Sequence, residues 1–436
     1  MTGQPVRSRQ TVREKIAIIR STLGYRGWRI VLAGFFMFLL AFGAPLTMPF
    51  VYPEVMKEFG WTLTQATLIY TYKSLTGAAV AIFIIGPLVD RVGLKPVLVS
   101  AMMAEAIGLA SFLFVHSLWS YYLVGFLIGT GQGAVLICIR LLVSRWFMRN
   151  IGLATGIAII GASFSGLVFP LVLSQLLPLY GWRVAFSCLS LAIFLVSIPI
   201  ALLCETNPTE EDVIQEAVRT LAPDSADRLR AAEIDSTFGA FIRQHTFWII
   251  AVATFLCAAV DQAMFQHSIF YLTTEVGLSR TVAASAWSVT FLIAMFVKFL
   301  AGWVYDRHSV KGIAFWNLLL AGAILLALPV QGFFTALLYT SMLGFARGGL
   351  SVDGPVVAKH VYGPRFMNRF LPIFAGFNTL GSATGPVVLA MLYDRTGSYM
   401  TGFTIFIGVV LVAAFMMWRV QPFYRNRLRT TAPEAL

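Results

Sequence analysis

The sequence predicts an all-α membrane protein with twelve transmembrane helices in two six-helix repeats. Its composition is the first reason: hydrophobic residues make up 58% of the 436 residues and charged residues 12%, against about 45–50% and 25% in soluble proteins. The second reason is the length of its apolar runs, and the third is an internal similarity between its halves. A soluble fold of this size has no interior large enough for so much apolar surface.

The apolar runs are long enough to cross a bilayer, which takes about 20 helical residues. Helices are expected because every backbone N–H and C=O group in lipid needs a partner within the protein. The predicted spans of the first half are 30–51, 65–88, 97–115, 119–143, 151–177 and 184–204. Those of the second half are 246–272, 282–304, 313–331, 335–358, 370–392 and 400–419.

The spans also define the predicted domains. These are an N-tail (1–29), an N-terminal half (30–204), a linker (205–245), a C-terminal half (246–419) and a C-tail (420–436). The linker contains nine acids and four bases. Its residues 209–221 form either a short amphipathic helix or part of a solvated connection.

The basic residues predict the orientation. Suppose that the N-terminus is cytoplasmic. Most of the 32 Lys and Arg residues then lie in cytoplasmic segments, and the segments on the other side of the membrane hold only Lys57, Arg183, Arg280 and Arg395. Such a bias indicates that both termini and the linker are cytoplasmic. A multi-pass protein of the cell (inner) membrane is expected, acting as a monomer in the lipid bilayer.

Several function classes lack support. The net charge of +12 is explained by the cytoplasmic loops, so no nucleic-acid partner is expected. The four cysteines lie in or at the end of apolar segments, and no two histidines are four residues apart, so neither a disulfide framework nor a metal site is predicted. No phosphate-binding loop or activated nucleophile is visible. We therefore expect no catalytic residue, no enzyme activity and no cofactor.

The halves resemble each other at an offset near 218 residues, as in proteins built from internal repeats. The matches are Gly86 with Gly302, Asp90-Arg91 with Asp306-Arg307, Lys95 with Lys311, Gly125 with Gly344, Gly156 with Gly376, and Gly161 with Gly381. They occur in one order at nearly one offset, so we interpret the halves as parallel repeats.

Two six-helix halves, with GPLVDRVGLKP at 86–96 and a weaker copy at 302–312, resemble the major facilitator superfamily. Further segments resemble its monocarboxylate and oxalate–formate porter branch. These are GWRIVLAGFFMF at 27–38, FGW at 59–61, TFGAFIRQHTFWII at 237–250, QHSIFYLTTEVGLS at 266–279 and GPVVLAMLYDRTGSY at 385–399. The resemblance covers the whole chain.

The resemblance implies a gate at the loop motif. In this superfamily the motif aspartate, here Asp90, faces the N-terminus of a helix in the other half, where a carboxylate meets free N–H groups and the positive end of the helix dipole. The alternative is that the charges only anchor the topology. The predicted gating residues are Gly86, Asp90, Arg91, Gly93, Lys95, Asp306 and Arg307.

Ionisable residues inside the spans are candidate functional residues because burying a charge in lipid is costly. Lys73, Glu105, Asp261, Lys298 and Arg347 lie near the middle of their spans, and Arg140, Asp353 and His267 lie nearer the ends. Cations exceed anions, which suits an anionic substrate. The predicted substrate-binding residues are Lys298, Asp261, Gln262, Gln266, His267, Lys73, Arg347 and Asn378. The residues predicted to take part in coupling or in a charge network are Asp261, Glu105, Asp353 and Arg140.

Lys298 is the main candidate because porters of this branch carry a basic residue here on helix 8, which binds the substrate carboxylate. The alternative is a lysine that extends toward the cytoplasm. The chain departs from animal-type porters at Ala294, where they have an aspartate, and in having no charge in span 1 after Arg29. It also has Asn378 in span 11, where oxalate porters use a cation. Asp261 is expected to supply the missing acid.

These features predict a secondary transporter of a small organic anion, most simply a monocarboxylate, by alternating access. Transport would be coupled to protons or to exchange for a counter-anion, and the substrate would bind between the halves. The alternative is a proton-driven efflux carrier for amphipathic compounds on the same scaffold.

Overall fold

The computed structural model describes residues 25–147, 151–209, 243–351, 357, 361–362 and 364–421, without the side chains of 151–152, 299, 302, 306 and 364–369. All regular structure in these ranges is helical. The predicted tails, most of the linker and Asp353 lie outside the described residues, as does the side chain of Asp306.

The N-terminal half contains the first group of helices. In order they are α2 (Gly27–Ala41), α3 (Gly43–Thr47), η1 (Met48–Phe50), α4 (Tyr52–Phe59), α5 (Leu63–Ala79), η2 (Val80–Ile84), α6 (Ile85–Val92), α7 (Leu94–Ala110), η3 (Ser111–Phe114), α8 (Leu118–Trp146), α9 (Ile151–Ala192), η4 (Ile193–Ser197) and α10 (Ile198–Leu203).

The C-terminal half contains the second group. It comprises α14 (His245–Phe270), η5 (Tyr271–Glu275), α15 (Arg280–His308), α16 (Lys311–Ala327), α17 (Phe333–Leu350), α19 (Pro364–Thr396) and α20 (Tyr399–Arg419).

Nine helices in the described ranges are long and apolar enough to cross a membrane. One of these runs from Leu153 to Leu203 and reverses at Gly181, where φ is +73°, so it provides two arms. With these arms and the shorter α16 and α17, the described helices are consistent with the twelve predicted spans.

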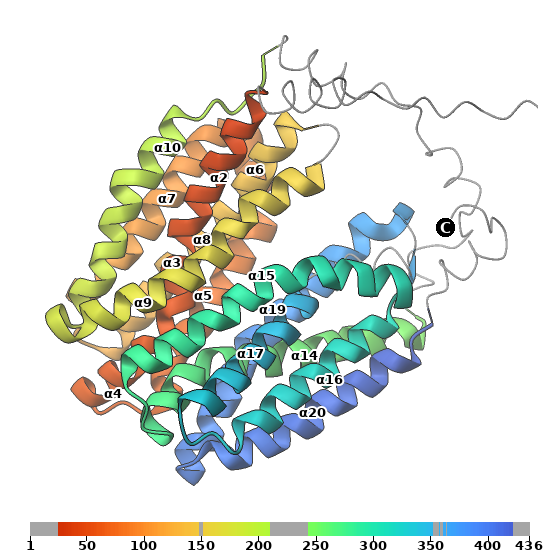
Figure 1. The fold of residues 1–436 in the computed structure, drawn as a ribbon. Helices are drawn as coiled ribbons and strands as arrows, with labels where there is room; N and C mark the ends of the chain where they lie inside the picture. The colour runs from red at the N-terminus through yellow and green to blue at the C-terminus, as the bar shows by residue number, and fades with distance from the viewer. Residues whose placement is uncertain are drawn as a thin grey trace, which may run out of the picture.

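Two faces of the molecule can be told apart by the turns between helices. The terminal face is where α2 begins and α10 and α20 end; the far face holds the turns at Gly60, Gly181, Gly277 and Gly397 (Figure 1). All four far-face glycines have φ between +70° and +77°, a conformation in which a side chain is disfavoured.

The two halves lie side by side in Figure 1, α2 to α10 in red to yellow-green and α14 to α20 in green to blue. Within each half the helices pack extensively, and the halves meet mainly through α9 with α15 and α5 with α19. These pairings are equivalent under the repeat, because α5 corresponds to α15 and α9 to α19.

The repeat extends to individual backbone contacts. A Cβ atom at Gly161 would lie 2.1 Å from the carbonyl oxygen of Phe35, and one at Gly381 would lie 2.2 Å from that of Phe255. Both residues of the first contact thus recur 220 positions later in the second. Small residues allow this approach because a larger side chain would separate the helices.

Candidate functional site

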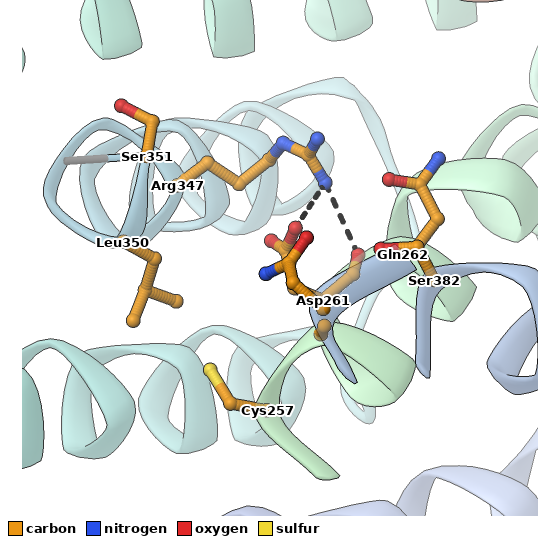
Figure 2. Close-up of a pocket in the computed structure, with 9 residues that line it drawn as sticks. Cys257, Asp261, Gln262, Arg347, Leu350, Ser351 and Ser382 are labelled. Atoms are coloured by element: carbon orange, nitrogen blue, oxygen red, sulfur yellow. Dashed lines mark hydrogen bonds and ion pairs between the residues drawn. The ribbon is translucent and has the colours of Figure 1, made fainter. Parts of the chain in front are cut away.

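The side chains of Asp261 on α14 and Arg347 on α17 form an ion pair inside the C-terminal half. Arg347 Nη1 lies 2.8 Å from Asp261 Oδ2 and donates a second hydrogen bond to the Asp261 carbonyl oxygen at 3.2 Å (Figure 2). The guanidinium carbon lies 4.0 Å from the centre of the Phe265 ring. The arginine is therefore fixed from two sides by α14.

This pair borders a cavity of about 180 Å³, here called the Arg347 cavity. α14, α17 and α19 contribute its walls, and the polar side chains gather around the ion pair (Figure 2). Its lining residues are Cys257, Ala258, Asp261, Gln262, Arg347, Leu350, Ser351, Asn378 and Ser382. The structure thus brings together four of the predicted substrate-binding residues.

The ion pair leaves hydrogen-bonding capacity unused. Asp261 Oδ1 is buried without a partner among the described residues, and only Nη1 of Arg347 makes a described hydrogen bond or ion pair. A guanidinium carries five N–H donors arranged as a fork. Arg347 therefore has donors available for a carboxylate in the cavity.

Lys298 lies on α15, outside the lining of the Arg347 cavity. Its Nζ donates a hydrogen bond to Ser163 Oγ on α9 at 3.0 Å, so it bridges the two halves. α15 packs against α17, the helix of Arg347. Lys298 and Arg347 therefore lie on neighbouring helices, although they do not line the same cavity.

Gln266 and His267 lie in the packed core rather than at the cavity. The Gln266 side chain accepts a hydrogen bond from Tyr52 Oη at 2.8 Å, across the halves. The two ring nitrogens of His267 lie 2.7 Å from Tyr399 Oη and 2.8 Å from the carbonyl oxygen of Pro386. Both nitrogens therefore have partners, as in a structural histidine.

Lys73 and Glu105 form a second charged group in the N-terminal half. Lys73 is 9% and Glu105 0% exposed, and each is the only charged group that acts on the other through space among the described residues. Lys73, although predicted to bind substrate, does not line the Arg347 cavity. The structure pairs Asp261 with Arg347 and places Lys73 near Glu105.

The remaining predicted residues lie toward the terminal face. Arg140, Asp90 and Arg91 have exposed side chains, and Asp90 has no hydrogen-bond or ion-pair partner among the described residues. Gly93 has a φ of +87°, a conformation in which a side chain is disfavoured. The Arg307 guanidinium lies 5.9 Å from the ring centre of Trp303.

An aspartate at the far face was not among the predicted functional residues. Asp394, at the end of α19, accepts hydrogen bonds from the backbone N–H groups of Leu63 and Thr64, at 3.0 and 2.9 Å. These are the first two residues of α5, so Asp394 caps a helix of the other half. An available signal was the sequence Asp-Arg-x-Gly, which occurs at both 90–93 and 394–397.

Other contacts between the halves also gather toward the far face. Arg280 pairs with Glu54, and Thr71 Oγ1 donates to the carbonyl oxygen of Ala383 at 2.6 Å. Together with the Tyr52–Gln266 and Asp394 contacts, they close this face between the halves.

Comparison with known proteins agrees with this architecture. The family model of the Major Facilitator Superfamily matches residues 31–339 and 254–434. The chain belongs to the Major Facilitator Superfamily.

Its curated relatives include transporters of the branch that the sequence resembles. Monocarboxylate transporter 13 of Bos taurus is 24% identical over 94% of this chain and 93% of its own. Monocarboxylate transporter 12 of Mus musculus is 23% identical over 73% and 70%. The hexuronate transporter of Bacillus subtilis is 22% identical over 84% and 88%.

Solved structures share the fold at low identity. A peptide transporter, POT, superposes with a TM-score of 0.72 at 14% identity, over 92% of this chain and 95% of its own. The nucleoside transporter NupG gives 0.70 at 16%, over 89% and 98%. The family match and the curated relatives identify this protein as a membrane transporter rather than an enzyme.

Proposed function

We propose that this protein is a secondary active transporter of a small organic anion, most simply a monocarboxylate. The observation that carries the proposal is the charge of its central site. Lys298 and Arg347 supply two cations there against one anion, Asp261, so one substrate carboxylate balances the site. The names of several relatives support the same substrate class.

Arg347 is the proposed carboxylate receptor. Its fork of donors matches a carboxylate, and in the structure Asp261 occupies only part of it. Lys298 adds a second positive charge from α15, so it attracts the same substrate without having to touch the Arg347 cavity. The other polar side chains of the cavity, Gln262, Asn378 and Ser382, are placed to bind the rest of the molecule.

The dimensions of the cavity favour this proposal over efflux of amphipathic compounds. Pockets for drug-sized ligands span about 300–1,000 Å³ and are mainly apolar, whereas the Arg347 cavity measures about 180 Å³ and has a charged, polar lining. A short organic acid fits these properties better.

Alternating access between the halves provides the route. Substrate binds in the centre, and the transporter opens to one face at a time. We propose that the terminal face is cytoplasmic, that the membrane is the cell (inner) membrane, and that transport is coupled to protons or to a counter-anion.

Uptake into proteoliposomes tests the proposal. The probes are radiolabelled lactate, pyruvate, oxalate and glucuronate, with and without a pH gradient, beside the amphipathic cation tetraphenylphosphonium. We expect saturable uptake of at least one acid and none of the cation. Arg347→Gln should lower the affinity at least tenfold, about 1.4 kcal/mol.

Arg395→Gln is the matched control, because Arg395 is exposed at the far face and should leave the affinity unchanged. Saturable transport of tetraphenylphosphonium, with no acid transported, would instead establish the efflux function.

A further inference from the structure

Glu105 is a carboxylic acid buried without a partner. It lies on α7 with 0% exposure, and neither carboxyl oxygen has a hydrogen-bond partner among the described residues. The neighbouring helix α8 leaves little room beside it, since a Cβ atom at Gly131 would lie 2.6 Å from the Glu105 Cβ atom. An ionised carboxylate at such a position is costly, so a proton is easily retained.

Lys73 is the cation that opposes this carboxyl. It is the more exposed member of the two, and its Nζ lies 4.8 Å from the centre of the Tyr70 ring. Lys73 and Tyr70 both lie on α5, which packs against α8 in its own half and against α19, a wall of the Arg347 cavity. Lys73 therefore lies on the helix that connects the half of the buried acid with the proposed anion site.

We propose that Glu105 carries the proton that this transporter moves together with its anion, and that Lys73 communicates the charge of Glu105 to the anion site. This inference rests on the proposed function. It selects proton symport from the two forms of coupling and assigns the proton to the N-terminal half.

Protonation of Glu105 is expected to strengthen anion binding, as a proton symporter requires. When Glu105 is ionised, it balances the charge of Lys73. When Glu105 takes up a proton, Lys73 is left uncompensated, and the positive potential toward Tyr70 and the anion site increases. Protonation therefore favours the anion, and by linkage the bound anion favours protonation to the same extent.

Few other groups face Glu105 from the helices around α7. On α8, Gln132 follows Gly131, which lies against Glu105, and the Gln132 Nε2 is buried without a described partner. Arg140 lies further along α8 with an exposed side chain. From α9, Ser190 donates to the carbonyl oxygen of Ala106 at 2.6 Å. Among the described residues, Lys73 is the charged group close enough to Glu105 for each to act on the other through space.

Asp261 is the competing proton carrier, because it is the other mid-span acid. It is also buried, and its Oδ1 has no described partner, but it has a direct counter-ion in Arg347 at 2.8 Å. A bound monocarboxylate balances the excess cation of that site without protonating Asp261. Glu105 has no such direct partner.

The first experiment uses Glu105→Gln in proteoliposomes with the best-transported acid of the lactate, pyruvate, oxalate and glucuronate panel. The neutral glutamine imitates the protonated acid. We expect exchange of labelled for unlabelled acid to persist, while accumulation driven by a pH gradient is lost. Glu205→Gln is the control, since Glu205 pairs with Arg26 at the exposed terminal face and should retain both activities.

The affinity profile is a readout that a purely structural role would not change. In the wild type, the affinity for the acid should fall about fivefold or more as Glu105 loses its proton with rising pH. In Glu105→Gln it should stay high at every pH, and Lys73→Gln should lower it throughout. Gradient-driven accumulation that persists in Glu105→Gln and is lost in Asp261→Asn would overturn the proposal.

The second experiment needs no substrate, so it separates the inference from the proposed function. Infrared difference spectra of the purified protein between acidic and alkaline pH should contain the C=O stretch of a buried protonated carboxyl group. This band should be absent in Glu105→Gln and present in Glu205→Gln. A spectrum unchanged by Glu105→Gln refutes the inference even if the anions are transported. The expected band with no transported acid leaves Glu105 titratable and refutes the proposed function instead.

Discussion

Lys298 has no acid one turn away on its own helix, where Ala294 and Gly302 flank it. In the structure its charge is met by the neutral Ser163 hydroxyl of the other half at 3.0 Å. A partly buried ammonium with one neutral acceptor remains under-compensated, so an anion placed near it gains binding energy.

Lys298→Gln is therefore expected to weaken substrate binding. The glutamine retains hydrogen bonding to Ser163 but removes the charge, so the affinity for the transported acid should drop at least tenfold, about 1.4 kcal/mol. Lys298→Arg should retain partial activity. The measurement is the concentration dependence of uptake; an unchanged affinity in Lys298→Gln would leave the lysine as a bridge between the halves only.

Sequence reasoning found the individual charges of the site because an ionisable residue in an apolar span is conspicuous by itself. It could not pair them. Asp261 and Arg347 are 86 positions apart, and helical periodicity gives the face of one helix without saying which helix faces it. Nor could it tell that His267 has a partner on both ring nitrogens, since Tyr399 and Pro386 come from two other helices.

At the scale of helices, the glycines of α19 control its distance from α14. A Cβ atom at Gly385 would lie 1.9 Å from the carbonyl oxygen of Ala259, whereas one at Gly376 on the same helix meets nothing within 4 Å. Both glycines lie in one predicted span, 370–392. Sequence alone could not separate them, because only the neighbouring backbone shows which one is in contact.

Gly385→Ala is expected to destabilise the C-terminal half by about 1–3 kcal/mol, since the methyl group must push α14 away. Gly376→Ala is the matched control and should be neutral or slightly stabilising, because alanine favours helix by up to about 1 kcal/mol. Thermal unfolding in detergent, followed by size-exclusion chromatography, measures both. Equal melting temperatures for the two variants would contradict the packing role of Gly385.

Asp394 and α5 form a contact between elements of opposite halves, and breaking it should favour opening of the far face. Asp394→Asn removes the charge that complements the α5 N-terminus, worth about 0.3–1 kcal/mol, and at least one of its two acceptor oxygens. We expect faster modification of a cysteine placed at Thr71 by a water-soluble maleimide. Asp394→Glu should lie between the wild type and Asp394→Asn, and a modification rate equal in all three would show that the contact does not hold the face shut.

The loop motif at the terminal face should act when the far face is open and the terminal face is closed. Asp90 is exposed in the structure, as expected if its partner is engaged only when the terminal face closes. Asp90→Asn should lower transport sharply while equilibrium binding of the acid persists. Normal rates of transport in this variant would reduce the motif to a determinant of topology.

Considering the whole molecule, composition and repeat offset were enough to predict the helical membrane fold and its two related halves. The offset succeeded because the repeat preserves close backbone contacts, such as those at Gly161 and Gly381. Which of the two faces is closed between the halves was not predictable from the sequence. It depends on contacts between the halves, such as Tyr52 with Gln266, and these side chains have no counterpart in a local sequence pattern.

The orientation of the whole molecule remains a prediction from the basic residues. In a background with Cys188→Ala, which removes the exposed native cysteine, Lys57→Cys and His308→Cys place one thiol on the far and one on the terminal face. A membrane-impermeant maleimide added to intact cells should label position 57 and not 308. The reverse pattern would invert the topology.

The far-face hydrogen bonds also have an osmotic consequence. When that face opens, the Asp394 carboxylate and its donors on α5 exchange their protein partners for water. Because hydrogen bonds to water compensate for most of each lost bond, opening costs only about 1 kcal/mol per bond. Opening therefore takes up water as if water were a ligand. Solutes such as sucrose, which are excluded from protein surfaces, should inhibit this step without occupying a binding site, and should slow transport by favouring the closed far face.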